Sequence, residues 1–226
     1  MTPNGSGQEG GHANEPGLRN GEAGLPAAFP LFHVENRDGW QQVGSTRLYD
    51  NPHVTVDRVE CLTPFRREKP VPWLVVKRKA AVALAAITES GEFVLISQER
   101  IPVQQTLWEF PAGQIDVPVT EITPETVVET ALRELREETG YGLAPGGKLE
   151  PMGWFLPSQG FTDEHVYLFQ AKPVCVVSRP EPDGSEHISD VRLVSPGELR
   201  RMIADNEITN ALTLALYARM AAKGTI

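Results

Sequence analysis

Apolar residues recur at helical spacing in the segment 124–139. The positions on its predicted buried face are Val128, Ala131, Leu132 and Leu135. Steps of three and four residues place side chains on one side of a helix, one turn above another. The segment is therefore predicted to be a helix that packs one face against a core.

Both ends of this helix are marked in the sequence. Thr123 can act as N-cap, and Pro124 suits the first helical position, where the missing N–H costs nothing. Gly140 suits the left-handed position just after the last turn. The helix is expected to begin and end at these residues.

Shorter apolar stretches bounded by turn residues predict β-strands. They lie at residues 32–34, 46–49, 54–59, 71–76, 80–88, 93–97, 108–112, 149–156, 165–171 and 188–194. The first four predict a small antiparallel sheet, and residues 80–97 predict a hairpin. Gly146 and Gly147 predict a turn.

Two more helices are predicted, one after a capping box that starts at Ser195 and one from Thr209 to before Gly224. The fold class is α/β (α+β).

The pattern divides the chain into three parts. Residues 1–30 are rich in Gly, Asn, Pro and Glu and are predicted to form a disordered tail. Residues 31–76 form an N-terminal β region, and residues 77–226 form the main domain.

Composition excludes several classes of function. The chain has 226 residues, a net charge of −9 and a pI of about 5.1. No basic patch is evident, which argues against nucleic acid or an anionic membrane as partner. No apolar run approaches membrane-spanning length, and the N-terminus lacks an apolar signal core, so a cytoplasmic location is expected. Cys61 and Cys175 are expected to be free thiols in a reducing compartment.

Three carboxylates lie close together near the end of the predicted central helix. Glu134, Glu137 and Glu138 occupy neighbouring positions on one polar surface, where like charges repel one another. Such a cluster favours a counter-charge, and hard oxygen ligands suit Mg²⁺ or Mn²⁺. The alternative is a solvated acidic face with ion pairs such as Glu129 to Arg133.

The order of residues in this helix resembles the box of the Nudix hydrolases. It reads Glu125, seven residues, and then Arg-Glu-Leu-Arg-Glu-Glu-Thr-Gly-Tyr over 133–141, which matches every fixed position of the family's pattern from Glu125 onward. The family's glycine six positions before that glutamate is Val119 here. The glycine that fits is Gly113, twelve positions before, so we interpret the difference as a six-residue insertion ahead of the helix.

The resemblance implies a Nudix fold, with a mixed sheet between helices and an N-terminal antiparallel β arm. Residues 97–100 and 108–113 are similar to the segment that leads into the box in ADP-ribose pyrophosphatases. In that branch the carbonyl of the residue at Ala112 binds metal together with the glutamates at 134, 137 and 138. The alternative for Ala112 is an ordinary tight turn. The implied reaction is Mg²⁺-dependent hydrolysis of ADP-ribose or a related ADP-sugar to AMP and a sugar phosphate, with Mn²⁺ possible.

The resemblance also implies catalytic roles. Arg133 would orient the glutamates, and either Glu164 or a box glutamate such as Glu137 would act as general base. Glu164 ends a loop in which Gln159 stands where the branch has a marker proline. The alternative for Glu164 is a solvated loop acid.

Substrate-binding residues are expected in and near the N-terminal region. Trp40 and Trp73 are candidates for stacking on adenine, and Arg78 and Arg100 for binding the diphosphate. Gly113 is the fifth candidate. The alternatives are core packing for the tryptophans and solvation for the arginines. Dimeric relatives place aromatics of this region around adenine, so a homodimer is expected.

Two other functions fit the same sequence. One is a pyrophosphatase for another nucleotide sugar, such as GDP-mannose or UDP-glucose. The other is a non-catalytic Nudix domain that senses a nucleotide sugar. The intact set of acidic residues favours an enzyme over a sensor, and measuring turnover separates the two.

Overall fold

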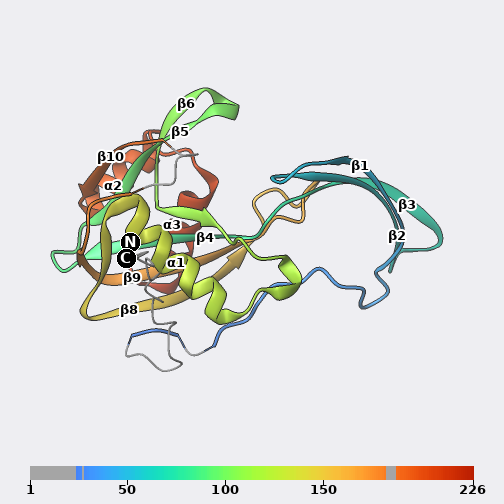
Figure 1. The fold of residues 1–226 in the computed structure, drawn as a ribbon, viewed down its shortest axis with the longest axis horizontal. Coiled ribbons are helices and arrows are strands. Elements are labelled where there is room, and N and C mark those ends of the chain that lie inside the picture. The colour runs from blue at the N-terminus through green and yellow to red at the C-terminus, as the bar shows by residue number, and fades with distance from the viewer. Residues whose placement is uncertain (1–23, 27, 182–186) are drawn as a thin grey trace, which may run out of the picture.

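A mixed β-sheet lies between helices in the computed structural model, which describes residues 24–26, 28–181 and 187–226 (Figure 1). Helix α1 (Pro124–Thr139) covers one face of the sheet, and helices α2 (Pro196–Ala204) and α3 (Ala211–Lys223) cover the other. This arrangement confirms the predicted fold class.

The main sheet contains seven strands. They are β4 (Ala81–Thr88), β5 (Phe93–Arg100), β6 (Gln105–Glu109), β7 (Ala112–Gln114), β8 (Tyr141–Phe155), β9 (Val166–Val176) and β10 (Ile188–Val194). The order is β10-β5-β4-β9-β8, with β6 paired to β5 and β7 paired to β4. The β4–β9 pair is parallel and the other pairs are antiparallel, which makes the sheet mixed. Short 3₁₀ helices occur at η1 (Ile101–Val103) and η2 (Val119–Glu121).

Strand β4 forms the centre of the core because both of its faces are buried. Ala85 and Ile87 pack toward α2 and α3, whereas Val82 and Leu84 pack toward α1. Side chains alternate across a strand, so a continuous apolar run suits a strand covered on both sides. The predicted hairpin of β4 with β5 is confirmed by the pairing of Ile87 with Phe93.

The N-terminal strands form a separate sheet that extends from the main domain as an arm (Figure 1). Its antiparallel strands are β1 (Gln41–Asp50), β2 (Thr55–Thr63) and β3 (Arg66–Lys77). The predicted strand at 32–34 is not paired in a sheet. Hydrogen bonds join the arm to the loop before β9, among them those from Val76 N to Phe161 O (2.7 Å) and from Trp73 Nε1 to Gly160 O (2.9 Å).

The chain packs onto the main domain earlier than the predicted boundary at residue 31. Phe29 lies 5.4 Å from the ring of Phe169, and Leu25 packs against the same core. Leu149 N donates a hydrogen bond to Gly24 O at 2.7 Å. Residues 1–23 and 27 of the predicted disordered tail lie outside the described residues.

Strand β8 is longer than predicted and contains the predicted glycine turn as an irregularity. Its pairing with β9 passes from Leu143 opposite Val174 to Lys148 opposite Lys172, so extra residues bulge out of β8. Gly146 has a φ of 77°, a conformation that glycine adopts without steric cost. Turn residues therefore mark a bulge here and not the end of a strand.

The helix boundaries follow the predicted caps closely. Thr123 accepts from the N–H of Thr126, and Gly140 is left-handed at φ 74°. Ser195 accepts from Glu198 N, but the Glu198 side chain pairs with Arg201 and does not complete the predicted capping box. Helix α3 begins after Asn210 and not at Thr209.

Within the described ranges, no helix has the length and apolarity that a membrane span requires. Cys61 and Cys175 are free thiols, as expected from their separation in the sequence.

Candidate active site

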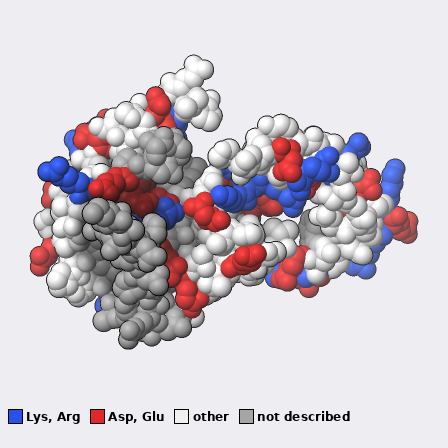
Figure 2. All heavy atoms as spheres, in the orientation of Figure 1, with Lys and Arg blue, Asp and Glu red and all other residues white. Residues whose placement is uncertain are grey.

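A cleft of about 420 Å³ lies where the arm joins the main domain. Figure 2 shows acidic side chains gathered in a hollow of the main domain and basic side chains along the adjoining arm. The lining residues come from many parts of the chain. They are His53, Arg78, Lys79, Ala81, Arg100, Ala112, Gly113, Gln114, Asp116, Arg133, Glu134, Glu137, Glu138, Glu164, Asn210 and Leu212.

Nine of the eleven predicted site residues line this one cleft. They are Arg78, Arg100, Ala112, Gly113, Arg133, Glu134, Glu137, Glu138 and Glu164. The other two, Trp40 and Trp73, lie outside it. The fold thus gathers residues that are up to 86 positions apart in the chain, as in the pair of Arg78 and Glu164.

Two of the three clustered glutamates of α1 are buried, although the sequence predicts that all three lie on a polar surface. Glu134 is 7% and Glu138 only 1% exposed, which corrects the expectation of one polar face. The reason is that β7 lies over this end of α1, and Ala112 N donates to Glu138 Oε2 at 2.9 Å. Two of the three carboxylates are therefore held within the protein at the floor of the cleft.

Arg133 connects two of these carboxylates. Its guanidinium contacts Glu134 Oε1 at 2.6 Å and Glu137 Oε2 at 2.7 Å. Burial disfavours the charged form of Arg133, but attraction by Glu134 and Glu137 outweighs it and raises the pKa of Arg133 above its ordinary value. The predicted ion pairs of Arg133 with these glutamates are present. The alternative partner, Glu129, is exposed on α1.

Gly113 makes room for one of the carboxylates. A Cβ atom built at this position would overlap the carboxyl group of Glu134. The φ of Gly113 is not in the left-handed region, so the need for glycine here is one of space. The close approach of β7 to α1 depends on this missing side chain.

The loop before β9 brings Glu164 to the edge of the cleft. Arg78 Nε donates to Glu164 Oε1 at 3.1 Å. Neighbouring Asp163 accepts from Arg78 N (3.2 Å) and from Lys77 Nζ (3.4 Å). These contacts fix the loop against the end of β3, so the arm and the loop reach the cleft together.

Arg100 has a different environment from the one expected of a phosphate ligand. Its Nε and Nη2 atoms form a two-pronged pair with the carboxylate of Glu109, at 3.0 and 2.5 Å. Glu109 is fully buried. A buried carboxylate requires a partner. The Nε and Nη2 groups of Arg100 therefore neutralise Glu109 within the protein.

Replacing Arg100 with alanine should therefore destabilise the fold. Removing one partner of a buried ion pair costs about 3–5 kcal/mol, and we expect the low end because Arg100 is partly exposed. Thermal unfolding of Arg100→Ala checks this, with the double variant Arg100→Met, Glu109→Leu as a control that should recover much of the loss. An unchanged melting temperature with a raised KM would instead assign Arg100 to the diphosphate.

Comparison with known protein families identifies the family of this chain. The family model described as NUDIX domain matches residues 77–216. The chain belongs to the Nudix family. The predicted resemblance is thereby confirmed, and the matched region contains most of the cleft.

Relatives of this Nudix protein include two proteins named ADP-ribose pyrophosphatase. The one from Bacillus subtilis is 32% identical over 139 residues, covering 62% of this chain and 70% of its own length. The one from Mycobacterium tuberculosis is 32% identical over 141 residues, covering 62% and 64%. A protein from Bacillus methanolicus named methanol dehydrogenase activator is 39% identical over 101 residues, covering 43% and 48%.

A solved structure shares the fold of this Nudix protein. It is described as an ADP compounds hydrolase, and it superposes with a TM-score of 0.64 over 85% of this chain and 100% of its own, at 15% identity. The comparison covers more than the matched Nudix domain alone.

The donors in the Nudix domain fit a divalent cation by their chemistry. Glu134, Glu137 and Glu138 offer hard oxygen atoms within one turn of α1, and Gly113 leaves space beside them. Across the described part of the chain, no three Asp, Glu, His or Cys side chains are already arranged to hold a metal ion. Arg133 now occupies two of the carboxylates, so a cation would compete with its ion pairs.

The two tryptophans lie on the arm of the Nudix protein, outside the cleft. Trp40 is 53% and Trp73 56% exposed, which argues against core packing for either one. Trp40 directly precedes Gln41, which pairs with Leu62, whereas Trp73 pairs with Val59. The two are thus separated along β2 by about 10 Å or more and do not face each other within one chain.

Five polar lining residues were not predicted from the sequence: His53, Lys79, Gln114, Asp116 and Asn210. Lys79 continues a cationic run after β3 and could have been found by its position. Asp116 lies in the inserted loop, where it contacts Lys79 (2.8 Å) and Arg133 (3.7 Å). Nothing in the sequence showed that His53 of the β1–β2 turn reaches the cleft, because that depends on how the arm joins the domain.

Proposed function

We propose that this Nudix hydrolase uses one water molecule to cleave the diphosphate of ADP-ribose, or of a related ADP-sugar, giving AMP and a sugar phosphate. The observation that carries the proposal is the composition of the cleft. Carboxylates of α1 share it with Arg78 and Lys79, which carry the charge that phosphate oxygens require. The two relatives named ADP-ribose pyrophosphatase support ADP-ribose as the substrate.

Mg²⁺, with Mn²⁺ as a substitute, would be held by Glu134, Glu137, Glu138 and the carbonyl of Ala112. When bound, a divalent cation supplies positive charge that offsets the charge of the diphosphate and favours attack by water. Arg133 would keep Glu134 and Glu137 in place through its ion pairs. Glu164, held at the cleft edge by Arg78, or Glu137 would accept the proton of the attacking water.

A substrate panel tests this function. ADP-ribose, GDP-mannose and UDP-glucose are each incubated with the protein and Mg²⁺, and the products are resolved by chromatography. We expect ADP-ribose to give AMP and ribose 5-phosphate with the highest kcat/KM. A preference for GDP-mannose or UDP-glucose would move the substrate to another nucleotide sugar, and binding without turnover of any of the three would favour a sensor.

The arm supports a homodimer. Tyr49, Trp73 and Leu74 are large apolar side chains that the arm leaves exposed. A small sheet with so little cover gains stability by packing against a partner, and a second copy is the partner we propose.

Light scattering at micromolar concentration should give the mass of two chains. Leu74→Glu places a charge on the arm's apolar surface and should shift the mass toward one chain, whereas Leu193→Glu, an equally simple change at an exposed site on β10, should not. A one-chain mass for the unaltered protein would contradict the dimer.

Stacking of adenine is proposed for Trp40 and Trp73, with one ring from each chain of the dimer because the register separates them within one chain. Trp73→Ala should raise KM for ADP-ribose about five- to hundredfold, with a much smaller change in kcat, since stacking on a base is worth about 1–3 kcal/mol. The same kinetics on Phe65→Ala, an exposed aromatic at the tip of the arm, provide the control. A strongly lowered melting temperature with unchanged KM would make Trp73 structural.

The cytoplasmic location remains a prediction, supported by the two free thiols.

A further inference from the structure

Asn210 lies at the beginning of α3 and lines the cleft together with Leu212. Both residues come from a part of the chain far from the Nudix box, and none of the roles proposed above uses them. They form a wall of the cleft that is neutral, whereas most other lining residues carry charge.

The orientation of the Asn210 amide is determined by its neighbour Thr213. Asn210 Oδ1 accepts from Thr213 N at 2.9 Å and from the Thr213 hydroxyl at 3.2 Å. That hydroxyl accepts from Phe110 N at 2.9 Å, so its own hydrogen is available for Asn210. An amide oxygen is the only side-chain atom of asparagine that can accept both bonds. The NH₂ group must therefore be the part left for a ligand.

Within the described residues, the Asn210 NH₂ group has no hydrogen-bond acceptor. Thr213, by contrast, is fully buried and links Asn210 to Phe110, in the short connection between β6 and β7. The two hydrogen bonds to Oδ1 hold the Asn210 amide in one orientation, and its nitrogen keeps two N–H donors. A donor positioned in advance loses little conformational freedom when it binds a ligand.

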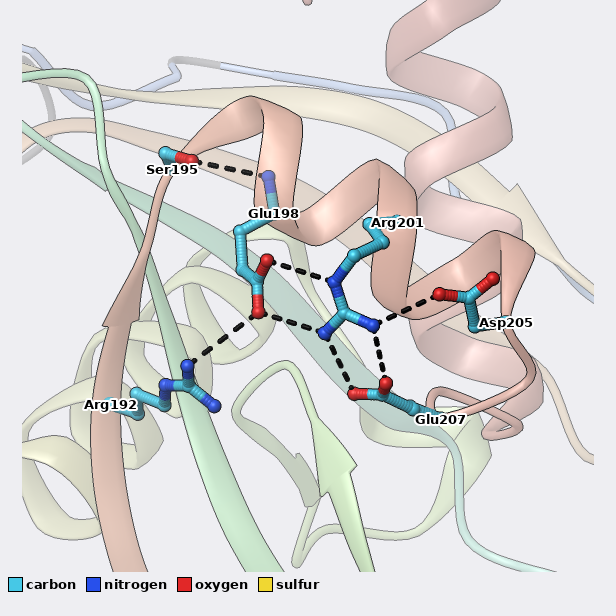
Figure 3. A network of polar contacts seen from close by, with 6 residues as sticks. All are labelled: Arg192, Ser195, Glu198, Arg201, Asp205 and Glu207. Carbon is cyan, nitrogen blue, oxygen red and sulfur yellow. Dashed lines mark hydrogen bonds and ion pairs between the residues drawn. The ribbon is translucent and has the colours of Figure 1, made fainter.

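The loop between α2 and Asn210 is anchored by a network of ion pairs around Arg201 (Figure 3). Arg201 contacts Glu198 on its own helix, and Asp205 and Glu207 in the loop. Hydrogen bonding to Arg201 lowers the pKa values of Glu198 and Glu207 below their ordinary range. Ile208 is buried beside this network, so the chain approaches Asn210 along a fixed path.

We propose, on the basis of the function proposed above, that Asn210 determines specificity by donating a hydrogen bond from Nδ2 to an oxygen of the terminal sugar, with Leu212 packed against the sugar ring. Phosphate oxygens are matched by the cationic groups Arg78 and Lys79. A neutral donor beside an apolar side chain suits a sugar, which combines hydroxyl oxygens with C–H surface. The wall of Asn210 and Leu212 is therefore the sugar side of the cleft.

Asn210→Ser tests this inference with little disturbance of the fold. Serine is as good an N-cap as asparagine, so the Thr213 N–H keeps an acceptor while the NH₂ donor is lost. We expect the dissociation constant of ribose 5-phosphate, measured by NMR titration, to rise about three- to tenfold, the value of one hydrogen bond, and that of AMP to stay the same. For ADP-ribose, kcat/KM should fall by a similar factor.

Ser195→Ala is the matched control, because it removes the N-cap of α2 (Figure 3) at a site outside the cleft. It should lower the melting temperature without changing either dissociation constant. Equal weakening of AMP and ribose 5-phosphate by Asn210→Ser would place the amide on a phosphate, and no weakening would leave it as a cap alone; both overturn the inference. Absence of ADP-ribose turnover by the unaltered protein would refute the proposed function separately, since the binding comparison does not depend on turnover.

Discussion

Replacing Glu138 with glutamine should lower the turnover of ADP-ribose by at least about a hundredfold and leave the fold intact. Glu138 is buried at the floor of the cleft, where its Oε2 accepts the N–H of Ala112. The oxygen of a glutamine amide can accept the same hydrogen bond. The substitution therefore removes the negative charge that would hold a divalent cation and keeps the shape of the site.

Initial rates with saturating Mg²⁺ and a thermal melt of Glu138→Gln measure the two effects separately. Glu129→Gln is the matched control, because Glu129 lies on the same helix and is exposed outside the cleft. It should retain the activity of the unaltered protein. Full activity of Glu138→Gln would remove this glutamate from the reaction.

Gly113→Ala should also reduce turnover, by about a hundredfold, through displacement of a neighbour. The added methyl group overlaps the carboxyl group of Glu134, so that side chain or strand β7 must move. A shift of about 1 Å in a catalytic group can cost a factor of this size. Because the backbone of Gly113 is accessible to alanine, we expect the loss in kcat to exceed the loss in stability.

The control is Gly197→Ala in the first turn of α2, where, apart from the adjacent residues and the helix backbone, the nearest atom to the new methyl group is Ser195 Oγ at 3.9 Å. It should leave activity unchanged and slightly raise the melting temperature, since alanine is the better helix former. Comparable kcat values for Gly113→Ala and the unaltered protein would show that the close approach of β7 to α1 is not needed for turnover.

The parts of the fold that follow from local sequence were predicted well. Thr123 and Gly140 act within one turn of the chain, so the ends of α1 could be located without tertiary structure. The same holds for the buried run of β4. The glycine pair in β8 shows the limit, because a bulge and a turn require the same backbone freedom and only the partner strand decides between them.

Residues of the candidate site were predictable where they belong to one motif. The box glutamates and Gly113 lie in a continuous segment, and the fold brings them together as expected. Asn210 was not found, since its place in the cleft depends on the packing of α3 against β4 and its neighbours. Arg100 shows a further limit: its buried partner Glu109 is supplied by the pairing of β5 with β6.

Chromatography of ADP-ribose incubated with the protein and Mg²⁺, with and without excess chelator, tests whether the protein is a cation-dependent ADP-ribose hydrolase. We expect equal amounts of AMP and ribose 5-phosphate with Mg²⁺, and loss of both products when the cation is removed. Intact ADP-ribose after incubation with Mg²⁺, or unchanged product formation in excess chelator, would contradict it.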